Sequence, residues 1–249
     1  MIPTSISRAL IGISLMAGLA SQQAFAAHWE YKGEHGSAHW ADIDPAFKEC
    51  ALGQHQSPVD IVKTEKAALP ALQFDYQSGA PVIWNNGHTV QVNVPAGSKL
   101  TVGDQTYDLL QFHFHAPSEE AFNGKRYPMV AHLVHKTASG QLGVVAVLIR
   151  AGKHNTALAP IFDHLPRVGE KISVDELSLN MASVLPADHG YYNFDGSLTT
   201  PPCSEGVNWM VLKSPIELSR AQIQAFQRLV KFNARPLQPL NGRVVRESM

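Results

Sequence analysis

The stretch Gln-Phe-His-Phe-His at residues 111–115 constrains the fold of this chain more than any other segment. In an extended strand successive side chains point to opposite faces, so Gln111, His113 and His115 share one face. Phe112 and Phe114 then point to the other face. The segment therefore predicts a strand with an apolar face on one side and two neighbouring imidazoles on the other.

Strand-forming sequence also dominates the rest of the middle of the chain. Gly103-Asp104 is a two-residue hairpin signal between two such segments. Helical periodicity is scarce: Ser219 and Gln222 form a capping box ahead of an apolar helical face, and residues 155–165 predict a second, shorter helix. The expected fold class is α+β, mainly β, a single domain on a large central, mostly antiparallel twisted sheet with small peripheral helices. The predicted strands cover residues 81–85, 88–94, 99–102, 105–115, 127–136, 142–150 and 207–213.

Residues 1–26 are predicted to be a signal peptide and not part of the fold. An apolar run at 9–20 is too short to span a bilayer, and Ala24-Phe25-Ala26 fits a small-x-small cleavage site. An uncleaved anchor is the alternative. Cleavage after about Ala26 leaves a domain of residues 27–249, enough for one sizeable core, and the periplasm is its expected destination.

Charge and cysteine content narrow the class of protein further. The net charge is −1 without a basic run or stripe, which argues against nucleic acid and membrane surfaces as partners.

The only cysteines in the sequence are Cys50 and Cys203, and in an oxidising compartment they are expected to form a disulfide. It would close a loop of about 150 residues, worth about 5 kcal/mol on the chain-entropy model. Two metal-binding thiolates are the alternative, but no Cys-x-x-Cys spacing accompanies them.

A third histidine, His132, lies in the next strand-like segment, Ala-His-Leu-Val-His at 131–135. The connection is long enough for the two strands to lie side by side, which would bring His132 to His113 and His115. Three imidazoles with a fourth position left to water form a catalytic Zn²⁺ site and not a structural one. A His-x-His pair on a strand is more often only a polar face, and with twelve histidines in the chain chance pairs are common. Only the surrounding residues can distinguish a metal site from a polar strand face here.

Short motifs spread along nearly all of residues 27–249 support the catalytic interpretation. They are Trp29-Glu-Tyr31, His39-Trp40, Gln56-Ser-Pro-Val-Asp-Ile61, Asn85-Asn-Gly-His88, Gln111-Phe-His-Phe-His115, Ser118-Glu119, His132-Leu-Val-His135, Gly196-Ser-Leu-Thr-Thr-Pro-Pro202, Trp209-Met-Val-Leu-Lys213 and Asn233-Ala-Arg-Pro236. In number, order and spacing the chain resembles the alpha-class carbonic anhydrases. The resemblance implies Zn²⁺ on His113, His115 and His132, and reversible hydration of carbon dioxide by a zinc-bound hydroxide. Neutral ligands let the ion ionise its water near neutral pH, an effect for which carbonic anhydrase is itself the reference example.

The resemblance also assigns residues that aim the hydroxide and hold the substrate. Thr199 would accept a hydrogen bond from the hydroxide and pass its own hydroxyl proton to Glu119. Seen alone, Thr199 is a turn residue, and Glu119 beside Glu120 is ordinary surface charge. Carbon dioxide is apolar and needs an apolar wall beside the ion. Val134 lies on the same strand face as His132, two residues on, and by resemblance Val144, Leu198 and Trp209 join it. Thr200 is also expected to bind substrate.

Proton release is assigned by resemblance to His88, whose imidazole titrates in a suitable range. A solvated histidine after a turn is the alternative. Tyr31, Asn86 and Gln91 would line the water path. The outer N–H groups of the metal ligands need hydrogen-bond acceptors, and Gln111 is expected to serve His113, with backbone near Asn233 serving His115.

The chain departs from the family pattern at Val130, where the family normally has a glutamate two residues before the third histidine. Valine cannot accept a hydrogen bond from His132. Unless water or another group substitutes, the His132 ring is less well fixed, and loss of such a partner costs about 10–100-fold in metal affinity or activity, a range that itself draws on carbonic anhydrase. The sequence therefore predicts that zinc is held less tightly, or exchanges faster, than in relatives with the glutamate.

Two other functions are weighed against catalysis. One is a catalytically silent zinc-binding recognition domain of the same family, supported only by Val130. The other is zinc storage, for which a fourth protein ligand is expected and none is apparent. The expected partners are carbon dioxide and bicarbonate, with no nucleic acid and no membrane. A homodimer stays open, and the resemblance implies inhibition by anions and sulfonamides.

Overall fold

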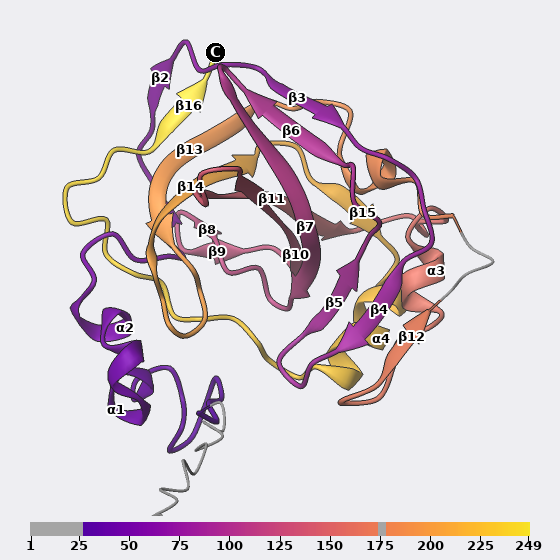
Figure 1. The fold of residues 1–249 in the computed structure, drawn as a ribbon, viewed down its shortest axis with the longest axis horizontal. Helices are drawn as coiled ribbons and strands as arrows, with labels where there is room; N and C mark the ends of the chain where they lie inside the picture. The colour runs from indigo at the N-terminus through magenta and orange to yellow at the C-terminus, as the bar shows by residue number, and fades with distance from the viewer. Residues whose placement is uncertain (1–26, 174–177) are drawn as a thin grey trace, which may run out of the picture.

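The computed structural model describes residues 27–173 and 178–249 of the chain. The predicted signal peptide lies outside these ranges. Within them, no helix has both the length and the apolar character that a membrane span requires. The described chain folds around a large twisted sheet with short helices at its margins (Figure 1), which confirms the predicted fold class.

The strands of the described residues are short at the edges of the sheet and long in its centre. They are β1 (Asp60–Ile61), β2 (Glu65–Ala67), β3 (Leu72–Asp75), β4 (Val82–Asn85), β5 (Val90–Asn93), β6 (Lys99–Val102), β7 (Gln105–His115), β8 (Ala121–Phe122), β9 (Lys125–Arg126), β10 (Met129–Thr137), β11 (Leu142–Ala151), β12 (Lys171–Ser173), β13 (Tyr191–Ser197), β14 (Glu205–Leu212), β15 (Ile216–Leu218) and β16 (Arg246–Ser248).

Most of these strands join one sheet, ordered β12-β4-β5-β7-β10-β11-β14-β13-β16-β2 along its main path. Most neighbours are antiparallel, while β11 and β14 run parallel. The predicted hairpin at Gly103-Asp104 is confirmed, since Val102 pairs with Gln105 across it. β13 was not predicted because Asn193, Asp195 and Gly196 have low strand propensity. Antiparallel pairing with β14 stabilises β13 as a strand despite this low propensity.

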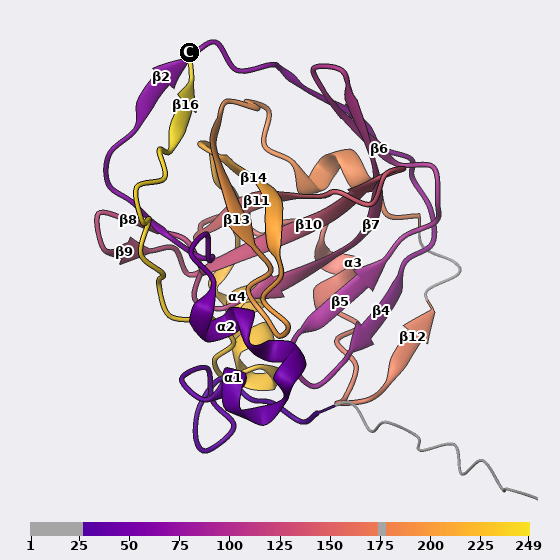
Figure 2. The same cartoon turned by 60° about the vertical axis from the view of Figure 1, so that its left-hand side comes forward.

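The helices lie outside the sheet, with α1 and α2 together at one end of the molecule (Figure 2). The predicted capping box of α4 is confirmed, since Ser219 and Gln222 cap each other's backbone N–H groups. The second predicted helix is much shorter than 155–165. Asn155 binds the backbone N–H of Leu158 in a turn, so that only residues 159–162 are helical. The helices are α1 (Trp40–Ile43), α2 (Glu49–Leu52), α3 (Ala159–Phe162) and α4 (Arg220–Leu229), with 3₁₀ turns at Pro45–Phe47 and Met181–Val184.

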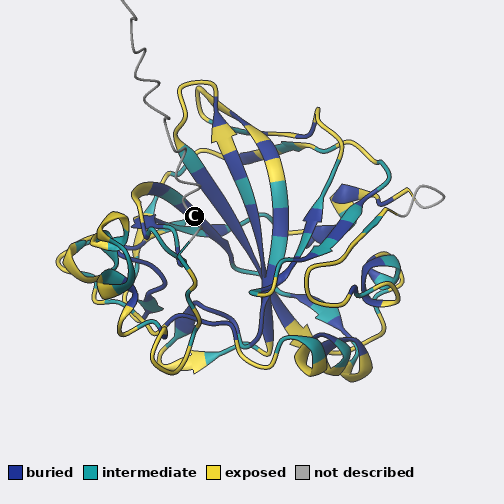
Figure 3. Cartoon of the chain, turned by 60° about the horizontal axis from the view of Figure 1, so that its bottom comes forward, coloured by how far each residue is buried: buried dark blue, intermediate teal, exposed yellow. Residues whose placement is uncertain are grey.

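The central strands are buried on both faces (Figure 3). In β10 and β11, Leu133 and Val145 belong to the larger apolar cluster, while Val130 and Val144 belong to a second cluster on the opposite face. A strand that is buried on both faces has a nearly continuous apolar sequence, as residues 142–150 have. The polar face of β7 therefore lies beside an apolar surface formed by side chains of β10, β11 and β14.

Candidate metal centre

Three histidines converge on one face of the sheet. β7 and β10 are antiparallel neighbours, and their register places His132 directly opposite His113. His115 follows two residues further along β7 on the same face. One ring nitrogen from each histidine lies within 4.8 Å of the other two. The pairing of two strands thus brings together donors that are 17 to 19 positions apart in the sequence (132 − 115 and 132 − 113).

The two histidines of β7 each have one ring nitrogen held by a hydrogen-bond acceptor. His113 Nδ1 lies 2.9 Å from Gln111 Oε1, and His115 Nδ1 lies 2.6 Å from the backbone oxygen of Asn233. If each Nδ1–H donates to these oxygens, each Nε2 keeps its lone pair for the centre of the group. Both acceptors are those expected from the sequence.

The third ring has an acceptor that the sequence analysis did not identify. Glu120 Oε1 lies 3.0 Å from His132 Nε2, which leaves Nδ1 for the centre. Val130 packs in the apolar cluster with Val144 and Trp209. Another group therefore substitutes for the missing glutamate, the alternative that the sequence left open, and Val130 is no longer a reason to expect loosely held zinc. The one local clue was the second carboxylate of the Glu119-Glu120 pair.

The electrostatics of the three rings suit a cation. Burial, followed by the nearby His132, lowers the pKa of His113 to about 3, and the same causes lower the pKa of His115 well below its usual value. Both rings are neutral at ordinary pH. Burial also lowers the pKa of His132, but Glu120 and Glu119 outweigh it and raise the pKa overall. His115 Nε2 is buried without a hydrogen-bond partner. Three inward nitrogen donors of this kind fit Zn²⁺.

Glu119 lies beside the three rings and is completely buried. Its Oε1 accepts a 2.7 Å hydrogen bond from the backbone N–H of Arg235. Its Oε2 lies 3.5 Å from His115 Nε2 and 3.8 Å from His132 Nδ1. Burial raises the pKa of Glu119 to about 7, against the opposing effects of His132, the Arg235 N–H and the nearby Thr199 hydroxyl. The structure thus brings together the two residues expected to aim the nucleophile.

A small, largely apolar cavity of about 130 Å³ opens from His113 and His132. All five residues predicted to hold the substrate line it. They come from three strands and from the loop after β13. These residues are Val134, Val144, Leu198, Thr200 and Trp209.

A second cavity, of about 150 Å³, leads from the histidines towards the surface. It is lined by the residues predicted for the proton path, namely Tyr31, Asn86, His88 and Gln91. His88 stacks on Trp29 with ring centroids 3.7 Å apart and planes 6° from parallel, a contact absent from the sequence analysis. Burial, followed by the nearby His28, lowers the pKa of His88, while Glu30 partly opposes them.

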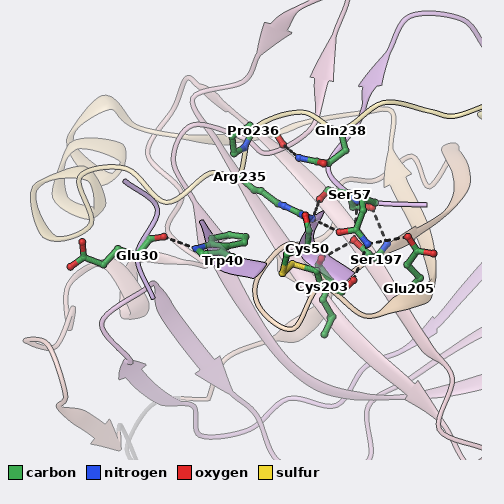
Figure 4. Close-up of a disulfide and its surroundings, with 12 residues drawn as sticks. Glu30, Trp40, Cys50, Ser57, Ser197, Cys203, Glu205, Arg235, Pro236 and Gln238 are labelled. Atoms are coloured by element: carbon green, nitrogen blue, oxygen red, sulfur yellow. Dashed lines mark hydrogen bonds between the residues drawn. A yellow bond between two sulfur atoms is a disulfide. The ribbon is translucent and has the colours of Figure 1, made fainter. Parts of the chain in front are cut away.

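The loop that carries Thr199 is fastened to the N-terminal part of the chain (Figure 4). Cys50 and Cys203 form the predicted disulfide. Beside it, the buried guanidinium of Arg235 donates to Gln56 Oε1 at 2.8 Å, to the backbone oxygen of Ser57 at 2.7 Å and to that of Cys50 at 3.1 Å. Arg235 therefore joins Glu119 to the segment around the disulfide, a role that sequence reasoning missed.

The chain is similar to carbonic anhydrases over most of its length. The model of the eukaryotic-type carbonic anhydrase family matches residues 35–249. A carbonic anhydrase from Pectobacterium atrosepticum is 42% identical over 236 residues, which cover 94% of this chain and 97% of the relative. The solved alpha-carbonic anhydrase of Photobacterium profundum is 46% identical with a TM-score of 0.84, covering 88% of this chain and 100% of that one. The alpha-carbonic anhydrase of Thermovibrio ammonificans, solved with the inhibitor sulfanilamide, is 42% identical with a TM-score of 0.86, covering 89% and 100%.

Proposed function

Because this chain belongs to the eukaryotic-type, or alpha-class, carbonic anhydrase family, an enzyme family whose general reaction is carbon dioxide hydration, we propose that it catalyses this reaction at a zinc site. The products are bicarbonate and a proton. The observation that carries the proposal is the convergence of His113, His115 and His132 beside the 130 Å³ cavity. We assign the metal to Nε2 of the first two rings and to Nδ1 of the third.

Zn²⁺ bound there would lower the pKa of a coordinated water so that it can attack near neutral pH, an effect whose reference example is carbonic anhydrase. The protein holds the rings of His113 and His115 neutral and correctly turned. Gln111 and the Asn233 carbonyl do this for His113 and His115. Such outer contacts fix the tautomer of each ring and raise its basicity towards the metal.

Thr199 and Glu119 are proposed to orient the attacking oxygen. Glu119 is held by the Arg235 N–H, and in this proposal it accepts the proton of the nearby Thr199 hydroxyl. Once the Thr199 hydroxyl donates its proton to Glu119, the Thr199 oxygen can only accept a hydrogen bond from the attacking group. It therefore favours a nucleophile that carries a proton and disfavours anions that cannot donate one.

Carbon dioxide is apolar, and the cavity beside His132 offers it an apolar surface. Val134 and Val144 are paired across β10 and β11, and Trp209 pairs with Val144 from β14. Three adjacent strands therefore hold this wall rigidly. Carbon dioxide bound there would lie next to the metal, and it would make no hydrogen bond to the wall that had to break before it reacted.

His88 is proposed to carry the proton to solvent through the polar cavity. Its lowered pKa keeps the ring neutral over more of the pH range, so that it can accept a proton, and buffer in the open mouth can take that proton away. Asn86 Oδ1 accepts from the backbone N–H groups of His88 and Thr89 and so fixes the turn that presents the ring.

The direct test is stopped-flow carbon dioxide hydration against pH, with zinc measured on the same sample. Zinc near one equivalent with rapid hydration supports the proposal. Zinc near one equivalent with negligible hydration would favour the silent recognition domain instead. Sulfanilamide, named in the Thermovibrio ammonificans structure, is the inhibitor to try first. We also propose that residues 1–26 direct export to the periplasm, in keeping with the disulfide.

A further inference from the structure

We propose that Glu120 is the positioning residue for His132, replacing from a loop the glutamate that the family normally carries on the strand at the position of Val130. The inference rests on the proposed zinc site. It concerns which part of this chain fixes the third ring and how that ring's metal is retained.

The contact itself has the geometry of an outer acceptor. Glu120 Oε1 lies 3.0 Å from His132 Nε2, and both side chains are essentially fully buried. Since a carboxylate accepts only, Nε2 carries the proton, and in the neutral ring that binds a metal Nδ1 has the lone pair. His113 and His115 are held in the opposite sense, through Nδ1. All three rings therefore turn a bare nitrogen to the same point.

The burial of the Glu120 carboxylate also favours a cation near it. Glu119 and Glu120 are both fully buried, and among the described residues their ion-pair partners within 4.0 Å are histidines only. Buried carboxylates are costly unless a positive charge lies nearby. A divalent cation bound by the three rings would provide that charge, with one carboxylate on each side of His132.

The loop between β7 and β8 holds Glu120 in place before any metal binds. Ser118 Oγ donates to the Glu120 backbone oxygen at 2.7 Å and accepts from the Tyr127 N–H at 3.0 Å. Arg126 donates to the Ser118 backbone oxygen at 3.0 Å. The carboxylate is thus delivered by a loop fixed at several points and does not depend on a mobile side chain at the surface.

This arrangement predicts the effect of placing a glutamate at position 130, where the family normally has one. Val130 lies on the same strand face as His132, within an apolar cluster. A glutamate added there while Glu120 is present would bury a further carboxylate close to two others. The single substitution should therefore speed zinc loss or destabilise the protein. It should improve zinc retention only when Glu120 has been removed.

The experiment measures zinc loss from zinc-loaded protein to excess chelator in four forms: the unmodified chain, Glu120→Gln, Glu120→Leu and Glu120→Leu/Val130→Glu. Gln keeps the size and one acceptor oxygen, whereas Leu removes the acceptor. We expect loss from Glu120→Leu to be about 10-fold or more faster, a range established on carbonic anhydrase itself, with Glu120→Gln in between. The double variant should recover most of the retention.

A second measurement separates positioning from packing. In protein labelled with ¹⁵N-histidine, the His132 Nε2–H proton should be lost or shifted in Glu120→Leu and present in Glu120→Gln. The Nδ1–H signals of His113 and His115 should persist in both, showing that the fold is intact. Glu120→Leu with unchanged zinc loss and an unchanged His132 signal would overturn the inference. So would failure of Val130→Glu to restore retention in a folded double variant. An unmodified chain that binds no zinc would instead overturn the proposed function.

Discussion

Removing the disulfide with Cys50→Ala/Cys203→Ala should destabilise the fold strongly and change turnover of the folded enzyme little. The cysteines are separated by 153 positions. On the chain-entropy relation, a loop of this length restricts the unfolded chain by about 17 cal/mol/K, or about 5 kcal/mol at 25 °C. This stabilisation acts on the unfolded state and does not require the bond to place any catalytic group.

The folded loop has other attachments that keep Thr199 in position. Ser197 Oγ accepts from the Ser57 N–H at 2.9 Å, and Gln56 Nε2 donates to the Cys203 backbone oxygen at 3.0 Å (Figure 4). Within the loop, the Cys203 N–H donates to the Thr200 backbone oxygen at 2.9 Å. The first two hydrogen bonds join the same two segments as the disulfide, and the third stiffens the loop itself. Turnover without denaturant should therefore stay within a few-fold of the unmodified enzyme.

The assay is urea unfolding followed by tryptophan fluorescence, with zinc saturation matched because bound metal adds its own stabilisation. Carbon dioxide hydration is measured on the same samples without urea. A loss below about 2 kcal/mol would refute the unfolded-state explanation. A turnover loss above about 10-fold in fully folded protein would show that the bond itself positions the Thr199 loop.

Three further perturbations test other parts of the site. His88→Ala should slow hydration at low buffer concentration and be rescued by added imidazole, and unchanged low-buffer turnover would exclude His88 as the proton carrier. Val144→Phe should fill much of the 130 Å³ cavity and depress hydration with zinc content unchanged; full activity would place carbon dioxide elsewhere. Burial lowers the pKa of His135 to about 4, so the unfolded chain binds the proton first as the pH falls from about 6.5. The contribution of His135 to the free energy of unfolding should be fully present above pH 6.5 and fall by about 3 kcal/mol towards pH 4, and His135→Gln should reduce the pH dependence of the urea midpoint accordingly.

Much of the scaffold could be read from local pattern. The alternation in residues 111–115 predicts the end of β7 and places two imidazoles on one face, as the structure has them. The capping box at Ser219 marks the start of α4. These features depend on side chains a few residues apart, so a one-dimensional pattern is enough to reveal them. β13 and the short α3 were misjudged because partner strands and a turn hydrogen bond outweigh propensity there.

The residues of the metal group were determined by the sequence itself, because strand periodicity and the family motifs single out His113, His115 and His132. Only the tertiary structure decided how each ring is held. Glu120 reaches His132 across 12 positions from a loop, and Arg235 reaches Glu119 across 116. No local periodicity encodes such contacts, since they arise when the sheet closes and buried polar groups must find partners that are distant in the sequence. For this reason Val130 suggested a missing acceptor, whereas the folded chain supplies that acceptor from a different segment.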